Sequence, residues 1–447
     1  LAEWVTEGAT EWDMWSCDPR RFTAFAADPA YAEAKAIEVY GHEYAMHFPH
    51  HAWPAGRPVK RSPVHDRVAA LGAQFGATNG WERALWYARP GDDTSEAATL
   101  TWSREGPWFE AVRAECLAVR DAAGILDLPG FSRFRLAGPG ARAWLDEQAA
   151  GRLPRPGRVG LLYFADDRGR LVTEMTALAF GPDDFLLITA AAAQCHDFEW
   201  LARRLPAGAG FALADETDDW ACQILTGPAS RAVLAGCAEA DLAAPWLSHG
   251  PGRIAGRDCL LARVSFAGEL GWEIHSRVAD TPAVFDAVLA AGAPHGLRPF
   301  GMFALDSLRI EKGYRAWKGD LSTDYSLLEL GLDRFVDWAK PAFRGRAPLL
   351  AERQRGPARR FATLAVDAAD CDAPYMSTVW SNGTVVGETT SGAWGHRVGR
   401  SLALGMLRAD LASEGIEVEV EIFGERRPAT VLADGPAWDP SNARLRA

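Results

Sequence analysis

Apolar residues follow two different periods along the chain, and the changes between them divide it into regions. The middle of the chain alternates short apolar runs with amphipathic stretches, a pattern typical of mixed strands and helices. Strands are predicted at residues 132–137, 160–164, 172–180, 185–189, 259–266 and 271–276, and helices at residues 141–148, 196–205, 281–291 and 302–312. We therefore expect an α+β fold in this part of the chain.

The last region, residues 360–447, shows short strand patterns separated by turn signals and little helix. Asn382-Gly383 stands between two strand-like runs, which is a strong signal for a two-residue hairpin turn. Residues 416–423 alternate apolar residues with glutamate, as expected for a strand with one solvated face. This region predicts an all-β domain, either a barrel or a sandwich.

The first 90 residues have a different character. A helix is predicted over residues 29–40, but four prolines within residues 49–63 forbid a helix there. We expect a connector that covers a neighbouring surface and does not fold alone, followed by a polar linker at residues 91–103. Residues 1–5 have the composition of the middle of a helix, and the sequence begins without methionine. We therefore expect it to be part of a longer protein.

Two segments of the chain repeat one another. Leu136-Ala-Gly-Pro-Gly-Ala-Arg-Ala-Trp-Leu145 and Leu225-Thr-Gly-Pro-Ala-Ser-Arg-Ala-Val-Leu234 both predict a strand, a Gly-Pro turn and a helix. The simplest explanation is a duplicated unit and hence two related subdomains. The first copy is close to a dinucleotide-binding fingerprint, but the second copy loses a glycine and no acidic ribose ligand is well placed. A tight strand-to-helix turn is therefore favoured over a phosphate site.

Composition excludes several classes of function. The chain has 447 residues with 47 Lys and Arg against 59 Asp and Glu, a net charge of −12, which argues against a nucleic-acid-binding surface. It contains no apolar run of about 18 residues, so no membrane span is predicted. Its seven cysteines include no Cys-x-x-Cys pair, which indicates a reducing compartment and mostly buried thiols. We expect a cytoplasmic protein, or a mitochondrial matrix protein if it is eukaryotic.

Two glutamates are candidates for chemistry. Glu174 follows a turn on a predicted strand, and a carboxylate in mostly apolar company there suits proton transfer or the binding of a protonated amine. Glu273 is predicted to share a strand face with Gly271 and His275, whereas Ile274 points to the other face. Beside a glycine, its carboxylate has room for the edge of a flat 2-aminopyrimidinone. Ordinary solvated glutamates remain the alternative at both positions.

No metal site is predicted. The histidines of the connector, His42, His47, His50 and His51, have conceivable spacing, but no cysteine or carboxylate completes a ligand shell. No Ser-His-Asp arrangement and no Walker loop can be argued from the sequence.

Four sequence motifs follow one another in the same order as in a known protein family. They are residues 167–175 (Asp-Arg-Gly-Arg-Leu-Val-Thr-Glu-Met), 265–274 (Ser-Phe-Ala-Gly-Glu-Leu-Gly-Trp-Glu-Ile), 305–320 (from Leu-Asp-Ser to Lys-Gly-Asp) and 389–392 (Thr-Thr-Ser-Gly). They resemble the folate-binding aminomethyltransferases, the T-protein of the glycine cleavage system. The chain is more similar still to the C-terminal half of dimethylglycine and sarcosine dehydrogenases.

The resemblance implies a three-subdomain cloverleaf with a C-terminal all-β barrel, preceded by the tail of a flavin domain. The implied boundaries are 1–100 for the flavin-domain tail and connector, 101–350 for the folate-binding domain and 351–447 for the barrel. Glu174 matches the position of the catalytic acid. The implied folate-binding residues are Val172, Thr173, Glu174, Phe266, Glu273, Ile274 and His275. Phe266 departs from a usual tyrosine, Leu305 from a folate-binding arginine of the T-protein, and Pro129 from a usual serine.

The resemblance therefore implies tetrahydrofolate-dependent transfer of a one-carbon unit from an N-methyl amine, forming 5,10-methylenetetrahydrofolate. FAD is expected only in a missing N-terminal segment or a partner chain, because the flavin fingerprint is absent from this sequence. Two alternatives stay open. One is a stand-alone O- or S-demethylase that uses tetrahydrofolate, which would leave the connector with nothing to cover. The other is a folate-binding module without catalysis.

Overall fold

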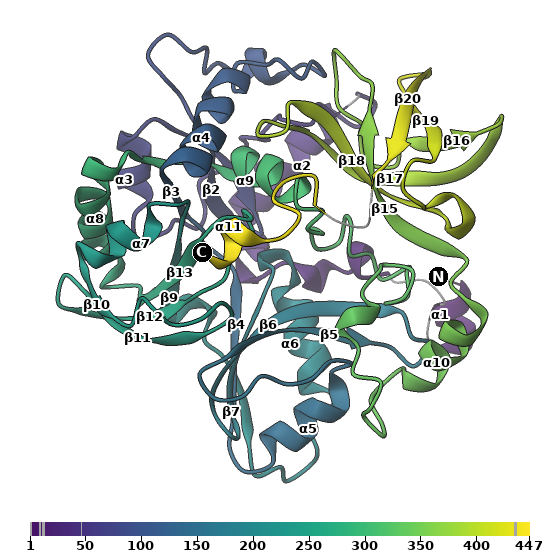
Figure 1. Cartoon of the computed structure of the whole chain (residues 1–447), viewed down its shortest axis with the longest axis horizontal. Helices are drawn as coiled ribbons and strands as arrows, with labels where there is room; N and C mark the ends of the chain where they lie inside the picture. Colours follow the sequence, from purple (N-terminus) through teal and green to yellow (C-terminus); the bar gives the residue numbers. More distant parts are fainter. Residues whose placement is uncertain (1, 9, 11–13, 46, 433–435) are drawn as a thin grey trace. The chain divides into compact units, whose positions relative to one another are not determined.

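The chain forms two compact units, each assembled from three separate stretches of sequence. Figure 1 labels helices and strands of both units. The computed structural model describes residues 2–8, 10, 14–45, 47–432 and 436–447. Unit 1 consists of Leu1–Phe25, Phe131–Thr217 and Ala316–Arg360, and unit 2 consists of Ala26–Gly130, Asp218–Arg315 and Phe361–Ala447. These spatial units cross the predicted sequence boundaries at residues 100 and 350, which stay a prediction.

Unit 1 is built on a five-stranded antiparallel sheet in the order β5-β6-β7-β4-β8. Its strands are β4 (Ser132–Ala137), β5 (Val159–Ala165), β6 (Leu171–Gly181), β7 (Asp184–Thr189) and β8 (Ala212–Asp215). Its α-helices are α1 (Ala2–Glu7), α5 (Ala141–Gln148), α6 (Gln194–Ala202) and α10 (Arg346–Arg355). Apolar residues of α5 and α6 pack with alternate residues of the strands, such as Phe134 and Met175, to form the core of the unit.

Unit 2 contains a seven-stranded sheet in the order β10-β11-β12-β13-β9-β3-β14, antiparallel except for the β3–β14 pair. Its strands are β3 (Ala123–Asp127), β9 (Trp220–Thr226), β10 (Ala238–Ala240), β11 (His249–Ile254), β12 (Arg257–Ala262), β13 (Gly271–Arg277) and β14 (Leu297–Pro299). The accompanying helices are α4 (Phe109–Asp121), α7 (Ser230–Ala235), α8 (Thr281–Gly292) and α9 (Met302–Ile310). Helices α7 and α8 pack on the face of β13 that carries Trp272 and Ile274.

The predicted repeat has the same local geometry in both copies. In unit 1, β4 passes through Gly138-Pro139 into α5, and in unit 2, β9 passes through Gly227-Pro228 into α7. Gly138 and Gly227 have φ angles of 125° and 120°, a region that favours glycine. A side chain at Gly227 would also lie within 2.7 Å of the carbonyl oxygens of Val119 and Ala122. A strand-to-helix turn explains both glycines without any bound phosphate.

The C-terminal region closes into a six-stranded barrel in the order β15-β18-β17-β16-β19-β20, and the predicted all-β domain is therefore a barrel. The strands are β15 (Arg359–Val366), β16 (Thr378–Ser381), β17 (Thr384–Gly395), β18 (Arg400–Arg408), β19 (Glu417–Ile422) and β20 (Glu425–Val431). Asn382 and Gly383 have φ angles of 50° and 74°, as a tight primed hairpin turn requires. The α+β class and the barrel are confirmed.

The N-terminal connector belongs to unit 2 from Ala26 onward. It contains α2 (Pro29–Gly41), α3 (His65–Ala70) and the hairpin β1–β2 (Ala73–Thr78 and Trp81–Tyr87), and the short helix α11 (Ala443–Arg446) ends the chain. Helix α2 begins where predicted, because Pro29 suits the first turn and the Asp28 carboxylate accepts the backbone N–H of Tyr31 at 2.9 Å.

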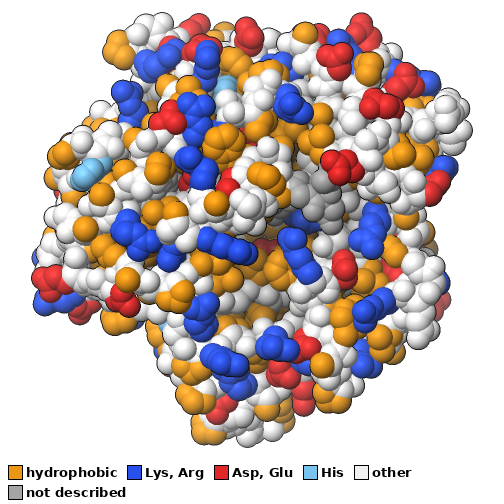
Figure 2. All heavy atoms as spheres, viewed as in Figure 1, with side chains coloured by type: hydrophobic (Ala, Val, Ile, Leu, Met, Phe, Trp, Pro, Cys, Tyr) orange, Lys and Arg blue, Asp and Glu red, His pale blue; other side chains and the backbone are white. Residues whose placement is uncertain are grey.

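The surface carries charged side chains of both signs. On the face shown in Figure 2, acidic and basic side chains are interspersed and hydrophobic atoms are scattered among them. Of the helices in the described residues, none is both long and apolar enough to cross a bilayer.

Candidate functional site

Glu174 lies in the middle of β6 in unit 1, where it pairs with Tyr163 of β5. Its side chain is half-buried, whereas the neighbouring Thr173 is fully buried. The Thr173 hydroxyl donates to Asp197 on α6 at 2.7 Å. The strand thus presents Glu174 while Thr173 is held in the interior, so any contact of Thr173 with a ligand would be through its backbone.

Asp197 is a buried carboxylate that no sequence motif indicated as part of a site. It accepts hydrogen bonds from the hydroxyls of Thr173 and Thr189 at 2.7 and 2.5 Å, and its other oxygen lies 2.7 Å from Nδ1 of His196. The same Thr189 hydroxyl lies 3.3 Å from the backbone oxygen of Glu174. Asp197 therefore ties β6 and β7 to α6 beside Glu174, and it fixes the backbone that carries this glutamate.

Val172 lines a cavity of about 640 Å³ within unit 1. Leu171 lines it from the same strand, and His196 and Trp200 line it from α6. Among the described residues, the lining includes Val172 but not Glu174.

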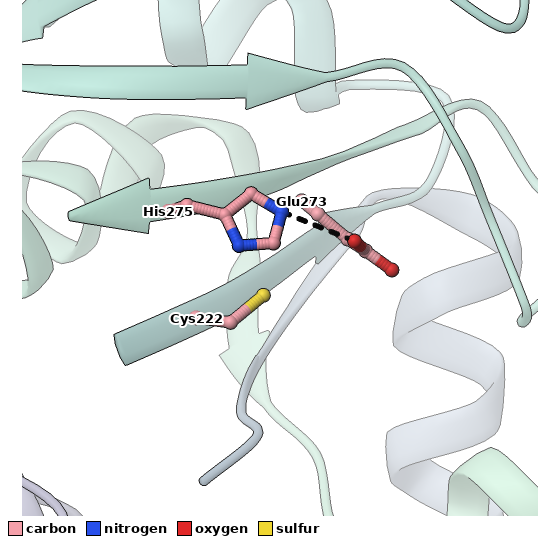
Figure 3. A group of neighbouring side chains, drawn as sticks. All are labelled: Cys222, Glu273 and His275. Carbon is pink, nitrogen blue, oxygen red and sulfur yellow. Dashed lines mark ion pairs between the residues drawn. The ribbon is translucent and has the colours of Figure 1, made fainter. Parts of the chain in front are cut away.

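The second group of predicted residues lies in unit 2. Glu273 and His275 stand two residues apart on β13, and Nε2 of His275 lies 3.2 Å from a carboxylate oxygen of Glu273 (Figure 3). The His275 side chain is 1% exposed and that of Glu273 is 24% exposed. Cys222 lies opposite His275 on β9 and completes the cluster. The predicted common face of Glu273 and His275 is confirmed.

Ile274 points to the opposite face of β13. It is fully buried and packs in the core of unit 2 with Trp272, Leu225 and residues of α7 and α8. The backbone alternation predicted this orientation, and it leaves Ile274 to position the strand rather than to contact a ligand through its side chain.

Phe266 lies in the loop between β12 and β13. The strand predicted over residues 259–266 ends at Ala262, because the chain turns at Gly268 and the Ser265 hydroxyl accepts the backbone N–H of Gly268 at 3.1 Å. Phe266 is exposed and stacks on Tyr314, with ring centroids 5.8 Å apart and planes 24° apart. Tyr314 lies in the motif of residues 305–320, but the sequence predicted no role for this tyrosine.

A buried charge network fixes the loop that carries Phe266. Glu269 of this loop is 1% exposed and accepts hydrogen bonds from Arg397 at 2.9 Å, Trp438 at 2.8 Å and Arg444 at 2.7 Å. Arg397 also pairs with the buried carboxylate of Glu311. Because a buried carboxylate is costly without partners, the barrel and the C-terminal tail together hold the loop in place.

The segment Asp127-Leu-Pro-Gly130, which follows β3, is held by the connector. Arg83 donates from Nε and Nη2 to the carbonyl oxygen of Pro129 at 3.2 and 3.0 Å. Gly130 has a φ angle of 84°, and a Cβ there would lie 2.4 Å from the ring of Trp81. Burial raises the pKa of Asp127 to about 6 and lowers the pKa of Arg83 to about 10. The connector is thus an integral part of unit 2.

The predicted site residues therefore fall into two groups. The structure brings Glu273 and His275 into one cluster in unit 2, with Phe266 on the loop that precedes their strand. It places Val172, Thr173 and Glu174 on one strand of unit 1.

Three family models match the chain. The GCVT N-terminal domain matches residues 64–340, which is more than half of the chain, and the glycine cleavage T-protein C-terminal barrel domain matches residues 359–439. The chain belongs to the glycine cleavage T-protein family. The FAD dependent oxidoreductase central domain matches residues 7–62, ahead of the T-protein part.

Individual relatives agree with this assignment. Dimethylglycine dehydrogenase from Mus musculus is 32% identical over the whole chain, which spans 52% of that protein. The chain thus spans about half the length of the curated relatives of this kind. Aminomethyltransferase from Frankia alni is 31% identical over 86% of this chain and 99% of its own length. The crystal structure of the glycine cleavage aminomethyltransferase T from Bartonella henselae has a TM-score of 0.73 and 23% identity, covering 84% of this chain and 97% of that one. This likeness confirms the T-protein fold.

Proposed function

We propose that the chain transfers a one-carbon unit to tetrahydrofolate as the C-terminal half or subunit of an FAD-linked N-methyl amine dehydrogenase. The amine would be of the dimethylglycine or sarcosine type, and the product would be 5,10-methylenetetrahydrofolate. FAD would be held by a preceding segment or a partner chain, in the cytoplasm or the mitochondrial matrix.

One observation carries the proposal: a segment of the FAD oxidoreductase type is built into the T-protein part of the same chain. Arg57 of this segment pairs with Glu82 of the T-protein part, and its side chain also donates to the Ala52 carbonyl oxygen at 2.7 Å. Helix α2 of the same segment exposes Ile37, Val39 and Tyr40. Apolar side chains gathered on one exposed helix suit a further protein surface, and a flavin domain is the partner that the family match favours.

The residues of unit 2 fit the pterin end of folate. The pterin edge offers two neighbouring N–H groups, and a carboxylate such as Glu273 is their natural bidentate partner. The aromatic pair Phe266–Tyr314 adds a flat apolar surface on the adjoining loop. Because Phe266 lacks a hydroxyl, this wall contributes stacking and shape rather than a hydrogen bond.

Glu174 would act on protons. Flavin, when bound in the assembled enzyme, oxidises the N-methyl amine to an iminium. In the transfer, two folate nitrogens bond to the iminium carbon, the carbon–amine bond breaks, and the two folate N–H protons leave with the departing amine as a protonated amine. A carboxylate beside the reacting atoms stabilises the cation and relays a proton, and Asp197 keeps the strand of Glu174 in position.

The proposal is tested with the chain assembled with its flavin-bearing segment or partner. Dimethylglycine or sarcosine labelled with ¹³C in the N-methyl group is supplied with tetrahydrofolate and an excess of a formaldehyde trap, and the label is followed by NMR. We expect the label in 5,10-methylenetetrahydrofolate despite the trap, because the one-carbon unit passes inside the protein.

Two other outcomes would replace the proposal. If all the label enters the trap at every folate concentration, the chain does not catalyse transfer, and separately measured folate binding would then identify a non-catalytic folate-binding module. If folate is methylated from an O- or S-methyl donor by the chain without flavin, it is a stand-alone demethylase.

A further inference from the structure

Cys222, Glu273 and His275 form a cluster of three potential metal ligands in unit 2. One ligand atom from each residue lies within 4.8 Å of the other two (Figure 3). Cys222 on β9 is the direct register partner of His275 on β13, and Glu273 stands two residues before His275. Because side chains alternate along a strand, all three project from the same face of the sheet.

The spacing of the nitrogen and oxygen atoms suits a shared ion. Nε2 of His275 and Oε2 of Glu273 are 3.2 Å apart. Two ligands of a tetrahedral zinc ion, with bonds of about 2.1 Å, are separated by about 3.4 Å. A direct hydrogen bond also explains this one distance. The thiol of Cys222 on the same side distinguishes the two explanations, because a metal site uses a third ligand whereas a His–Glu hydrogen bond does not.

The charges of the cluster also match a divalent ion. A thiolate and a carboxylate together carry two negative charges, and a neutral imidazole adds none, so a divalent cation would make the cluster neutral. Cys222 and His275 are buried, and buried charges in proteins are normally paired or bound to a metal. Sulfur and imidazole ligands favour Zn²⁺ and related transition metals over Mg²⁺ or Ca²⁺.

We propose that Cys222, Glu273 and His275 form a three-ligand site for a divalent transition metal of the Zn²⁺ class, with a fourth position open on the partly exposed side of Glu273. Three protein ligands and one open position are typical of reactive rather than closed structural zinc sites. A metal that engages the Glu273 carboxylate withholds it from a pterin edge. Bound Zn²⁺ therefore competes with folate, a consequence that rests on the function proposed above.

Cobalt reports on the site directly. Co²⁺ is titrated into the metal-free full chain, and the thiolate-to-cobalt absorption band in the near ultraviolet is recorded. We expect the band in the native chain and its loss in Cys222→Ser and Cys222→Ala. The Co²⁺ affinity should fall in both variants by at least the roughly 10–100-fold that the loss of a supporting contact costs at metal sites. Cys259→Ser is the matched control, since Cys259 is another buried thiol of the same sheet. The thiolate-to-cobalt band should persist in this variant.

The outcomes separate the metal site from the folate function. No thiolate band in the native chain, or a band that survives both Cys222 substitutions, overturns the metal site, provided that circular dichroism shows folded protein. Folate affinity is then measured with and without Zn²⁺ in the native chain and in Cys222→Ala. Competition in the native chain alone supports both proposals. A Cys222-dependent band without any effect of Zn²⁺ on bound folate supports the metal site and overturns the folate role of Glu273.

Discussion

Arg57 and Glu82 form a two-point ion pair in the interior of unit 2. Nε and Nη2 of Arg57 donate to the two carboxylate oxygens of Glu82 at 3.0 and 2.7 Å, and the side chains are only 10% and 4% exposed. Arg57 lies in the segment that matches an FAD oxidoreductase, whereas Glu82 lies in the T-protein part. This pair is therefore a direct link between the two.

Replacing Arg57 with alanine should lower the free energy of unfolding strongly. Removing one partner of a buried ion pair leaves the other charge unpaired, and this typically costs about 3–5 kcal/mol. The free energy of unfolding from urea titration is the measurement. Arg67→Ala is the control, because Arg67 and its partner Asp286 are 42% and 53% exposed and solvent-exposed ion pairs contribute little to stability. Equal losses in the two variants would show that the buried pair does not link the segments.

Glu174→Gln should slow transfer to folate by about 10²–10⁴-fold, the usual contribution of general acid–base assistance. Glutamine keeps the shape and loses the charge, so folate binding and amine oxidation should persist. Glu174→Asp should be milder, because aspartate keeps the negative charge on a side chain that is shorter by one methylene group. Glu147→Gln, an exposed site on α5 of the same unit, is the control. Initial rates of 5,10-methylenetetrahydrofolate formation and amine oxidation are measured separately, and an unchanged folate rate would leave Glu174 without a catalytic role.

Glu273→Ala should weaken folate binding by about tenfold or more. A charge-assisted hydrogen bond contributes about 1.5–3 kcal/mol, and about 1.4 kcal/mol corresponds to a factor of ten. Calorimetry with a chelator present gives the dissociation constant free of any metal effect. Glu239→Ala on β10 of the same sheet removes an exposed carboxylate and should leave the affinity unchanged. The same dissociation constant in both variants would contradict the assignment.

Glu115 should make unit 2 less stable as the pH rises. Its two carboxylate oxygens accept the backbone N–H groups of Tyr87 and Gly301 at 2.7 and 2.8 Å, and burial raises its pKa from 4.5 to about 8. Between these values the folded chain retains a proton that the unfolded chain releases. The free energy of unfolding therefore falls as the pH rises from about 4.5 to 8, by up to a few kcal/mol from this group.

Glu115→Gln removes this titration. Its free energy of unfolding should be lower at pH 5, because the amide group faces a backbone N–H, and its slope between pH 5 and 8 should be shallower than that of the native chain. Urea titrations at several pH values give both quantities. Asp127, whose raised pKa of about 6 acts in the same direction, remains in both proteins, so the difference in slope belongs to Glu115. Parallel slopes would mean that Glu115 is ionised in the folded chain.

Local signals predicted the regular elements well. Strand β4 and helix α5 have the predicted bounds, because Gly138-Pro-Gly140 ends one and starts the other. Phe266 shows the limit of such signals. The apolar pattern of Val264 and Phe266 continues past Ala262, but the backbone turns there, and pattern alone does not show a turn that depends on the Ser265 hydroxyl.

The candidate site was predictable where it depends on one strand. Glu273 and His275 share a face because they are two residues apart, and alternation alone gives that result. Cys222 joins them only through the register of β9 with β13, and Asp197 reaches Thr173 only through the packing of α6. Such contacts between distant segments have no period in the sequence, so they appeared only with the fold.

The Glu269 network also sets an order of events during synthesis. All of unit 1 has been synthesised once the chain reaches residue 360, but Glu269 gains its partners Trp438 and Arg444 only after residue 444 has been added. Until then the loop with Phe266 holds a carboxylate that lacks two of its hydrogen bonds. A chain truncated before Arg444 could still form the sheet of unit 1, but the loop with Phe266 would lack the hydrogen bond from Arg444 to Glu269. We expect chaperones and proteases to recognise such a chain more often than the full one.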